Sequence, residues 1–150
     1  MIDITKPKIS DVPEIEKILS FWTERREVDK YLERIKNEIN GKYQYNLRFW
    51  VAKENEETLG VIGLCDPLPK VIPFAKSIKP GEIKILYVDN RFRGKGIDRK
   101  LVEFIEKAAV NYGYQELVVR SAERYKNTAY GFYKKMGYLK TGIITNDNGK

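Results

Sequence analysis

A short basic turn carries residue types that could bind an anion. Arg91, Arg93 and Lys95 alternate there with Gly94 and Gly96. Glycine has no Cβ, so a phosphate group could approach the backbone closely. The first N–H groups of a helix have no intrahelical acceptor, and the helix dipole adds partial positive charge. The turn therefore predicts a diphosphate-binding site where a strand passes into a helix.

A strand and a helix must flank this turn to position it. Residues 82–88 are rich in β-branched and aromatic side chains, which favours a buried strand. Over about 95–112, apolar residues recur roughly every four positions, which predicts an amphipathic helix. The residues expected on its buried face are Ile97, Leu101, Ile105, Ala108 and Tyr112.

The sequence of the turn does not match the motifs of two other phosphate-binding loops. A Walker-A loop needs Ser or Thr after its lysine, but Gly96 follows Lys95. A dinucleotide fingerprint needs glycine three residues after its second glycine, and that position is Arg99. The remaining motif is Arg91-x-x-Gly94-x-Gly96. An ordinary basic turn stays open as the alternative to a diphosphate-binding site.

Composition limits the class of protein and the chemistry. The 150 residues are 33% charged and 42% hydrophobic, which predicts one soluble domain over residues 1–150. We expect no membrane span and no signal peptide, and the single cysteine, Cys65, favours the cytoplasm. Because histidine is absent, Ser-His-Asp and Cys-His catalysis are excluded and no metal site is expected. A general base would have to be a carboxylate, tyrosine, lysine or water.

The formal net charge of +7 is concentrated in residues 91–100 and 120–140. Such a field would attract a polyanionic cofactor. Ordinary solvated surface charge is the alternative. Nucleic-acid binding is not favoured, because no nucleic-acid-binding module is visible.

The order of predicted elements indicates an α/β or α+β protein with a mixed sheet. The expected elements are a strand at 2–5, helices at 11–22 and 27–39, strands at 47–53, 58–65 and 82–88, a helix at 95–112, a strand at 115–120, a helix from Asn127 to Met136, and a strand at 138–145. A proline-punctuated loop of about fifteen residues precedes the central strand, and it could be a lid or a rigid connector.

Two stretches about thirty residues apart resemble the GNAT superfamily of acyl-CoA-dependent N-acetyltransferases. They are Ile85-Leu86-Tyr87-Val88 with Arg91-Phe92-Arg93-Gly94-Lys95-Gly96-Ile97, and Asn127-x-Ala129-x-x-Phe132-Tyr133-Lys134-Lys135-Met136-Gly137-Tyr138. The resemblance implies the GNAT fold, with six to seven strands in a mixed central sheet and about four helices.

The resemblance also implies a binding site for acetyl-CoA. The backbone amides of residues 93–98 would hold the pyrophosphate, and the exposed edge of a bulged central strand would pair with pantetheine. The implied cofactor-binding residues are Leu86, Tyr87, Val88, Arg91, Phe92, Arg93, Gly94, Lys95, Gly96, Ile97, Asp98, Asn127 and Tyr133. At position 98 the family often has glycine, so the aspartate here could repel the diphosphate.

The implied reaction is direct transfer of an acetyl group from acetyl-CoA to a primary amine in a ternary complex. A backbone N–H near Leu86 or Tyr87 would polarise the thioester, and Tyr133 would protonate the departing thiolate. Glu82 is the candidate general base, acting through water. Each role has a structural alternative: Glu82 as a surface carboxylate, Tyr133 as a core aromatic, Asn127 as a helix cap. A covalent intermediate on Cys65 is not favoured.

The acceptor is expected to be a small-molecule amine, with a protein N-terminus or lysine as the alternative. A non-catalytic CoA-binding regulatory domain also stays open. Only about five residues follow Thr145, so the closing hairpin could be short and leave an open edge for a homodimer.

Overall fold

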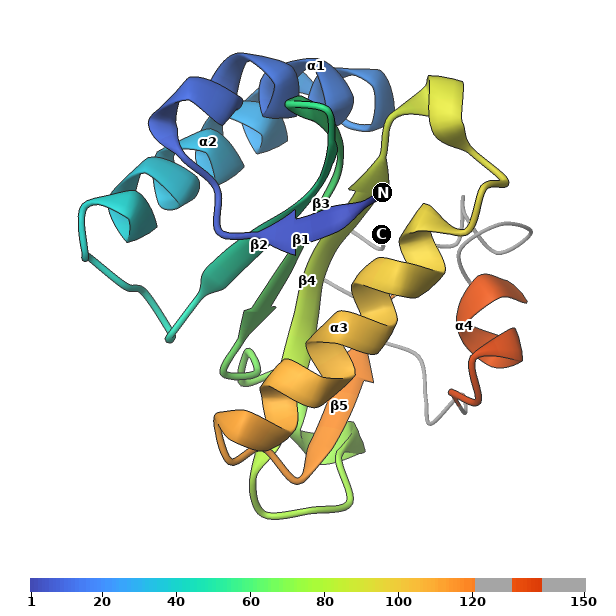
Figure 1. Ribbon diagram of the computed structural model, residues 1–150. Coiled ribbons are helices and arrows are strands. Elements are labelled where there is room, and N and C mark those ends of the chain that lie inside the picture. The colour runs from blue at the N-terminus through green and yellow to red at the C-terminus, as the bar shows by residue number, and fades with distance from the viewer. Residues whose placement is uncertain (121–130, 139–150) are drawn as a thin grey trace.

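The computed structural model describes residues 1–120 and 131–138 and has a mixed sheet as its centre (Figure 1). Within these residues five strands follow one another in chain order across the sheet. Neighbouring strands are antiparallel except the last pair, which is parallel. The strands are β1 (Asp3–Thr5), β2 (Arg48–Glu54), β3 (Glu57–Cys65), β4 (Pro80–Val88) and β5 (Glu116–Val119).

Helices cover both faces of the sheet. Two lie together on one face, and a third crosses the opposite face with a short fourth helix beside it (Figure 1). They are α1 (Val12–Trp22), α2 (Arg25–Ile39), α3 (Ile97–Asn111) and α4 (Gly131–Lys135), with 3₁₀ turns η1 (Ile9–Asp11), η2 (Ile72–Phe74) and η3 (Asn90–Phe92).

The alternation of side chains along the strands produces two hydrophobic cores. On β2, Phe49 and Val51 pack under α1 and α2, whereas Trp50 and Ala52 pack under α3. Both sides of β2 and β3 are therefore buried, which explains why these strands read as nearly continuous apolar runs.

A bulge in β4 changes which side chains face which core. Leu86 lies opposite Ile62, but Lys84 lies opposite Gly63, so Ile85 is an extra residue on β4. Because of this insertion Leu86 packs on the α3 side, as Ile83 does, whereas Ile85 packs toward α1 and α2.

β4 and β5 separate part of the way along β4. Their pairing begins at Pro80–Glu116 and ends at Ile83–Val119. Within the described part of the chain, β4 beyond Ile83 pairs with no strand on that side. A strand edge of this kind leaves backbone donors and acceptors available for another extended segment.

The expected fold class is confirmed, with differences at particular elements. Helix α2 begins at Arg25 rather than Glu27, and Tyr112, expected on the buried face of α3, is 43% exposed. The described sheet has five strands rather than six or seven. Residues 139–145 of the strand predicted at 138–145 and the helix start at Asn127 lie outside the described residues, so dimerisation through that last strand stays a prediction.

The proline-punctuated loop between β3 and β4 lies at the end of β4 opposite the glycine turn (Figure 1). The Glu116 carboxylate accepts hydrogen bonds of 2.9 Å from the amides of Lys76 and Ser77, and the Lys79 carbonyl accepts one of 2.8 Å from Gln115. These contacts support the connector interpretation rather than a lid over the turn.

Gly81 on β4 should not tolerate a side chain, because a Cβ there would lie 2.8 Å from the Tyr114 ring. We expect Gly81→Ala to lower the free energy of unfolding by about 1–3 kcal/mol, measured by urea denaturation. Combining it with Tyr114→Leu, which removes the ring, should cost less than the sum of the two single changes. A strictly additive double variant would contradict the predicted clash.

Candidate functional site

The glycine turn connects β4 to α3 and holds two left-handed glycines. Gly94 has φ +76° and Gly96 has φ +79°, a conformation in which a Cβ is strained. No atom lies within 4 Å of the place where a Cβ would stand at either position. Glycine is therefore required by the backbone conformation, and the space over the turn is open to a ligand.

The N-terminus of α3 provides the donors for an anion. The carbonyl of Gly96, the N-cap residue of α3, accepts a 3.1 Å hydrogen bond from the Lys100 amide. The amides before Lys100 precede the first intrahelical acceptor, and Arg93 and Lys95 are exposed beside them. The Asp98 carboxylate accepts a 2.8 Å hydrogen bond from the Arg99 amide, so one of these donors is already used.

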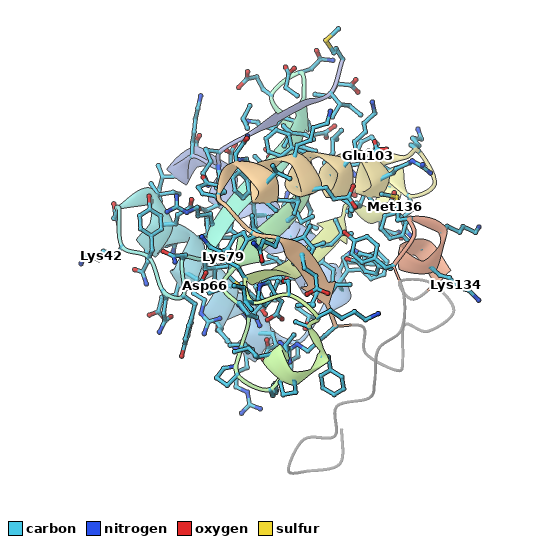
Figure 2. The ribbon with its side chains drawn as sticks, turned by 90° about the horizontal axis from the view of Figure 1, so that it is seen from below. Lys42, Asp66, Lys79, Glu103, Lys134 and Met136 are labelled. Carbon is cyan, nitrogen blue, oxygen red and sulfur yellow. The ribbon has the colours of Figure 1, made fainter. Side chains whose placement is uncertain are left out.

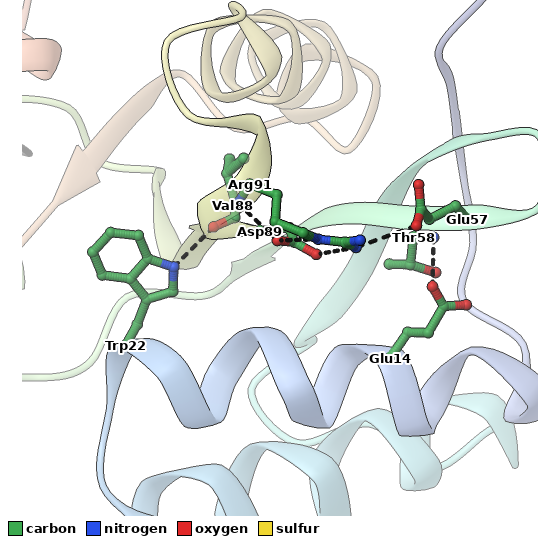
Figure 3. A network of polar contacts seen from close by, with 7 residues as sticks. All are labelled: Glu14, Trp22, Glu57, Thr58, Val88, Asp89 and Arg91. Carbon is green, nitrogen blue, oxygen red and sulfur yellow. Dashed lines mark hydrogen bonds and ion pairs between the residues drawn. The ribbon is translucent and has the colours of Figure 1, made fainter.

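The Arg91 side chain is held by two carboxylates (Figure 3). Its Nη2 lies 2.8 Å from Asp89 and 3.2 Å from Glu57. Hydrogen bonding to Asp89 raises the pKa of Arg91, and the same contact lowers the pKa of Asp89. Arg91 thus connects the turn to the start of β3. The guanidinium of Arg93 lies 5.0 Å from the centre of the Trp22 ring.

The last residue of α1 is attached to the end of β4. The Trp22 indole donates a 2.8 Å hydrogen bond to the Val88 carbonyl (Figure 3). Its ring stacks on Tyr87, with 6.4 Å between the ring centres. Phe92 in the following 3₁₀ turn packs against the α3-side core. These contacts fix the direction in which β4 leads into the glycine turn.

Tyr133 on α4 connects the second sequence motif to the first. It is 7% exposed and packs edge-on against Phe132 and Tyr138. Burial raises the pKa of Tyr133, and the negative charge of Asp98 and the neighbouring Tyr87 raise it further. The phenol therefore stays protonated at neutral pH, and it lies within electrostatic reach of both α3 and β4.

The placement of α4 supports this connection. Figure 2 shows Met136 between α4 and α3, with Lys134 pointing away from the sheet. Tyr133 is a core aromatic, since it is buried in the same cluster as Ile97 of α3, and the site role stays a prediction. Asn127 lies outside the described residues.

Glu82 is a buried carboxylate, so the alternative of a surface carboxylate at a strand end is wrong. It is 1% exposed, and its Oε1 accepts a 3.0 Å hydrogen bond from the Leu68 amide. Its Oε2 lies 3.2 Å from Nε of Arg120 and 3.7 Å from Nζ of Lys84. Lys84 and Arg120 were missed by the sequence analysis, although a lysine in an otherwise apolar strand was a usable signal.

Cys65 lies directly opposite Glu82 in the sheet and is 2% exposed. Burial, together with the negative charge of Glu82, raises the pKa of the Cys65 thiol to about 12. A thiol with that pKa carries almost no thiolate at neutral pH, which does not suit a nucleophile.

The described residues contain neither a metal-binding cluster nor a membrane-spanning helix. No group of three or more His, Cys, Asp or Glu side chains there could hold a metal ion. Every helix in residues 1–120 and 131–138 is too short or too polar to cross a bilayer.

The chain matches one protein family and several curated proteins. The family described as the acetyltransferase (GNAT) domain matches residues 45–140. N-acetyltransferase 8B of Homo sapiens is 33% identical over 123 residues, which are 81% of this chain and 51% of that protein. The chain therefore spans about half the length of the curated relatives that it matches.

Solved structures share the fold at low sequence identity. Aminoglycoside N-acetyltransferase AAC(6')-Iy in complex with CoA has a TM-score of 0.79 at 13% identity, covering 96% of this chain and 91% of that one. Glucosamine-6-phosphate N-acetyltransferase from Arabidopsis thaliana has a TM-score of 0.70 at 21% identity, covering 98% and 97%.

The glycine turn can be tested with CoA as the diphosphate probe. We expect Gly96→Ala to raise the Kd for CoA about tenfold, because the added methyl group strains the turn and occupies the space above it. Isothermal titration calorimetry would measure the Kd. Gly41→Ala is the matched control, since Gly41 has φ +80° and equally open surroundings but lies after α2. Equal affinity losses in both variants would contradict an anion site at the turn.

The burial of the Cys65 thiol can be tested by its reactivity. In the native protein near pH 8, Cys65 should react with a thiol-specific disulfide reagent at least about a hundredfold more slowly than in urea, where its pKa returns to about 8.5. Absorbance of the released thiol reports the rate. Similar rates in both states would show an accessible, ionised Cys65 and would reopen covalent catalysis.

Proposed function

This chain belongs to the GNAT acetyltransferase family, and we propose that it transfers an acetyl group from acetyl-CoA to a primary amine of a small molecule. The amine attacks the thioester directly in a ternary complex. The observation that carries this proposal is the combination of a bulged stretch of β4, which in the described residues has no strand on the side away from β3, with a glycine turn at the start of α3.

The cofactor would lie along β4 and end at the turn. Its pyrophosphate would accept hydrogen bonds from the amides of residues 93–98, with Arg93 and Lys95 supplying charge. Its pantetheine arm, which contains amide groups, would add to the unpaired edge of β4 at Leu86 and Val88. The Val88 carbonyl already accepts a hydrogen bond from Trp22, and its second lone pair is available to the arm.

The reacting thioester would then lie near the bulge. A backbone N–H at Leu86 or Tyr87 would polarise the carbonyl and stabilise the oxyanion of the tetrahedral intermediate. The Tyr133 phenol is protonated at neutral pH and would donate its proton to the CoA thiolate as it departs. Glu82, on the α1 and α2 side of β4, would take the amine proton through a water molecule.

The catalytic roles predict a loss of rate without a loss of cofactor. We expect Tyr133→Phe and Glu82→Gln each to lower kcat about a hundredfold, because each removes one proton-transfer group. Free thiol release from acetyl-CoA, measured across amines, amino acids, polyamines and peptides, reports the rate, and calorimetry should show CoA affinity within about twofold of the wild type.

Tyr45→Phe and Glu103→Gln are matched controls, since both side chains are exposed and neither is assigned a role in the transfer. Unchanged turnover in both test variants would overturn the assigned roles. CoA binding without turnover of any acceptor would support a non-catalytic CoA-binding domain, and acetylation restricted to peptides would support the protein-acetylating alternative.

A further inference from the structure

Charged side chains gather where β4 and β5 separate. The last paired residues are Ile83 and Val119. Lys84 is the next residue on β4, and Arg120 is the next residue after β5. Glu82 lies between their charges, and we call Glu82, Lys84 and Arg120 the fork cluster.

The fork cluster holds more positive than negative charge. Glu82 is 1% exposed and Lys84 is 9% exposed, so both charges are removed from water. The single carboxylate lies near both cations and also accepts a hydrogen bond from the Leu68 amide. Among the described residues, this cluster has two cations and one carboxylate, and buried charges are stable only when paired.

Helix α2 adds to the excess of positive charge. Lys30 and Arg34 flank the Tyr31 ring, at 5.7 Å and 5.9 Å from its centre. Burial raises the pKa of Tyr31, with Glu27 acting in the same direction and the cations Arg34 and Arg120 opposing it.

Neighbouring charges also act on the pKa of Lys84. Burial lowers the pKa of Lys84, the Glu82 carboxylate opposes that effect, and the charges of Arg120 and Lys30 add to it. Among the described groups acting on Tyr31 and Lys84, the cations Lys30, Arg34, Lys84 and Arg120 outnumber the carboxylates Glu27 and Glu82. Cys65 contributes no charge, because its thiol stays protonated.

We infer that the acceptor amine carries an anionic group, a carboxylate or a phosphate, which binds at Lys84 and Arg120. The inference rests on the proposed acetyl transfer, because that reaction places the thioester carbonyl near Leu86 and Tyr87. Leu86 is two residues beyond Lys84, which is about 7 Å along a strand. The anionic group therefore lies only a few bonds from the attacking nitrogen, as in an amino acid or a phosphorylated amino alcohol.

The same charges select against polycations. A polyamine or a lysine-rich peptide would bring additional ammonium groups to a region that already has excess positive charge. An acceptor anion instead adds a second negative charge beside Lys84 and Arg120, and Glu82 is left to interact with the ammonium group of the same molecule.

Matched pairs of acceptors test the inference. Phenylalanine and phenylalaninamide differ by a carboxylate, and phosphoethanolamine and ethanolamine differ by a phosphate. We expect kcat/KM to be at least about tenfold higher for the anionic member of one pair, mainly through KM. The pair that shows the effect identifies whether the anion is a carboxylate or a phosphate. Equal values within both pairs, or a preference for spermidine, would overturn the inference.

Variants assign the effect to the fork. Lys84→Met should reduce the preference for the anionic acceptor about tenfold, and Lys84→Arg should retain most of it. Lys107→Met is the matched control, because Lys107 is an exposed lysine on α3, and it should keep the full preference. A preference that survives in Lys84→Met would overturn the role of this lysine.

The failure of this inference can be told apart from failure of the proposed function. If acetyl-CoA binds and neutral amines are acetylated as well as anionic ones, the inference is wrong and acetyl transfer stands. If calorimetry shows no binding of acetyl-CoA and no acceptor is turned over, the proposed function is wrong and the inference falls with it.

Discussion

The parting of β4 from β5 is the constraint on which the rest of the structure depends. Backbone N–H and C=O groups in a sheet need partners, and a strand that loses its neighbour must find others. Here pairing ends at Ile83–Val119, while β4 continues to Val88. Among the described residues, this last part of β4 has no strand on the side away from β3. The 3₁₀ turn η3 connects it to the glycine turn, where the first amides of α3 lack intrahelical acceptors. One end of a long polar ligand could therefore meet the strand edge and the other the turn.

The bulge at Ile85 gives the two faces of β4 different roles. Without the extra residue, Glu82, Lys84 and Leu86 would point to the same side of the sheet. With it, the charged pair stays on the side of α1 and α2, while Leu86 packs toward α3. One strand can thus contact a cofactor on its free edge and carry charged groups on the face where an acceptor would approach.

Electrostatics distinguishes the two ends of the proposed site. At the glycine turn the cations are exposed and solvated, so they act mainly as a field that favours a polyanion. At the fork Glu82 and Lys84 are buried and Arg120 is 35% exposed, so an unmatched charge there is costlier than at the turn and therefore more selective. Arg91 belongs to neither group, since its contacts with Asp89 and Glu57 make it a connection between the turn and β3.

Local patterns in the sequence predicted much of this protein. Apolar periodicity located α1 and α3, and β-branched runs located β2, β3 and β4 to within a few residues. The spacing of Gly94 and Gly96 before a helix predicted an anion site because the left-handed backbone and the free amides are properties of neighbouring residues. The absence of histidine and the presence of one cysteine limited the chemistry in the same local way.

What the sequence could not determine depends on residues that meet only after folding. The burial of Glu82, its shared contacts with Lys84 and Arg120, and the hydrogen bond from Trp22 to Val88 join segments separated by up to 66 residues. Register decides these contacts, because one inserted residue in β4 moves every later side chain to the other face. The sequence pattern determined which helices and strands form. The tertiary structure decided which charged side chains they bring together, since burial and pairing are properties of the assembled sheet.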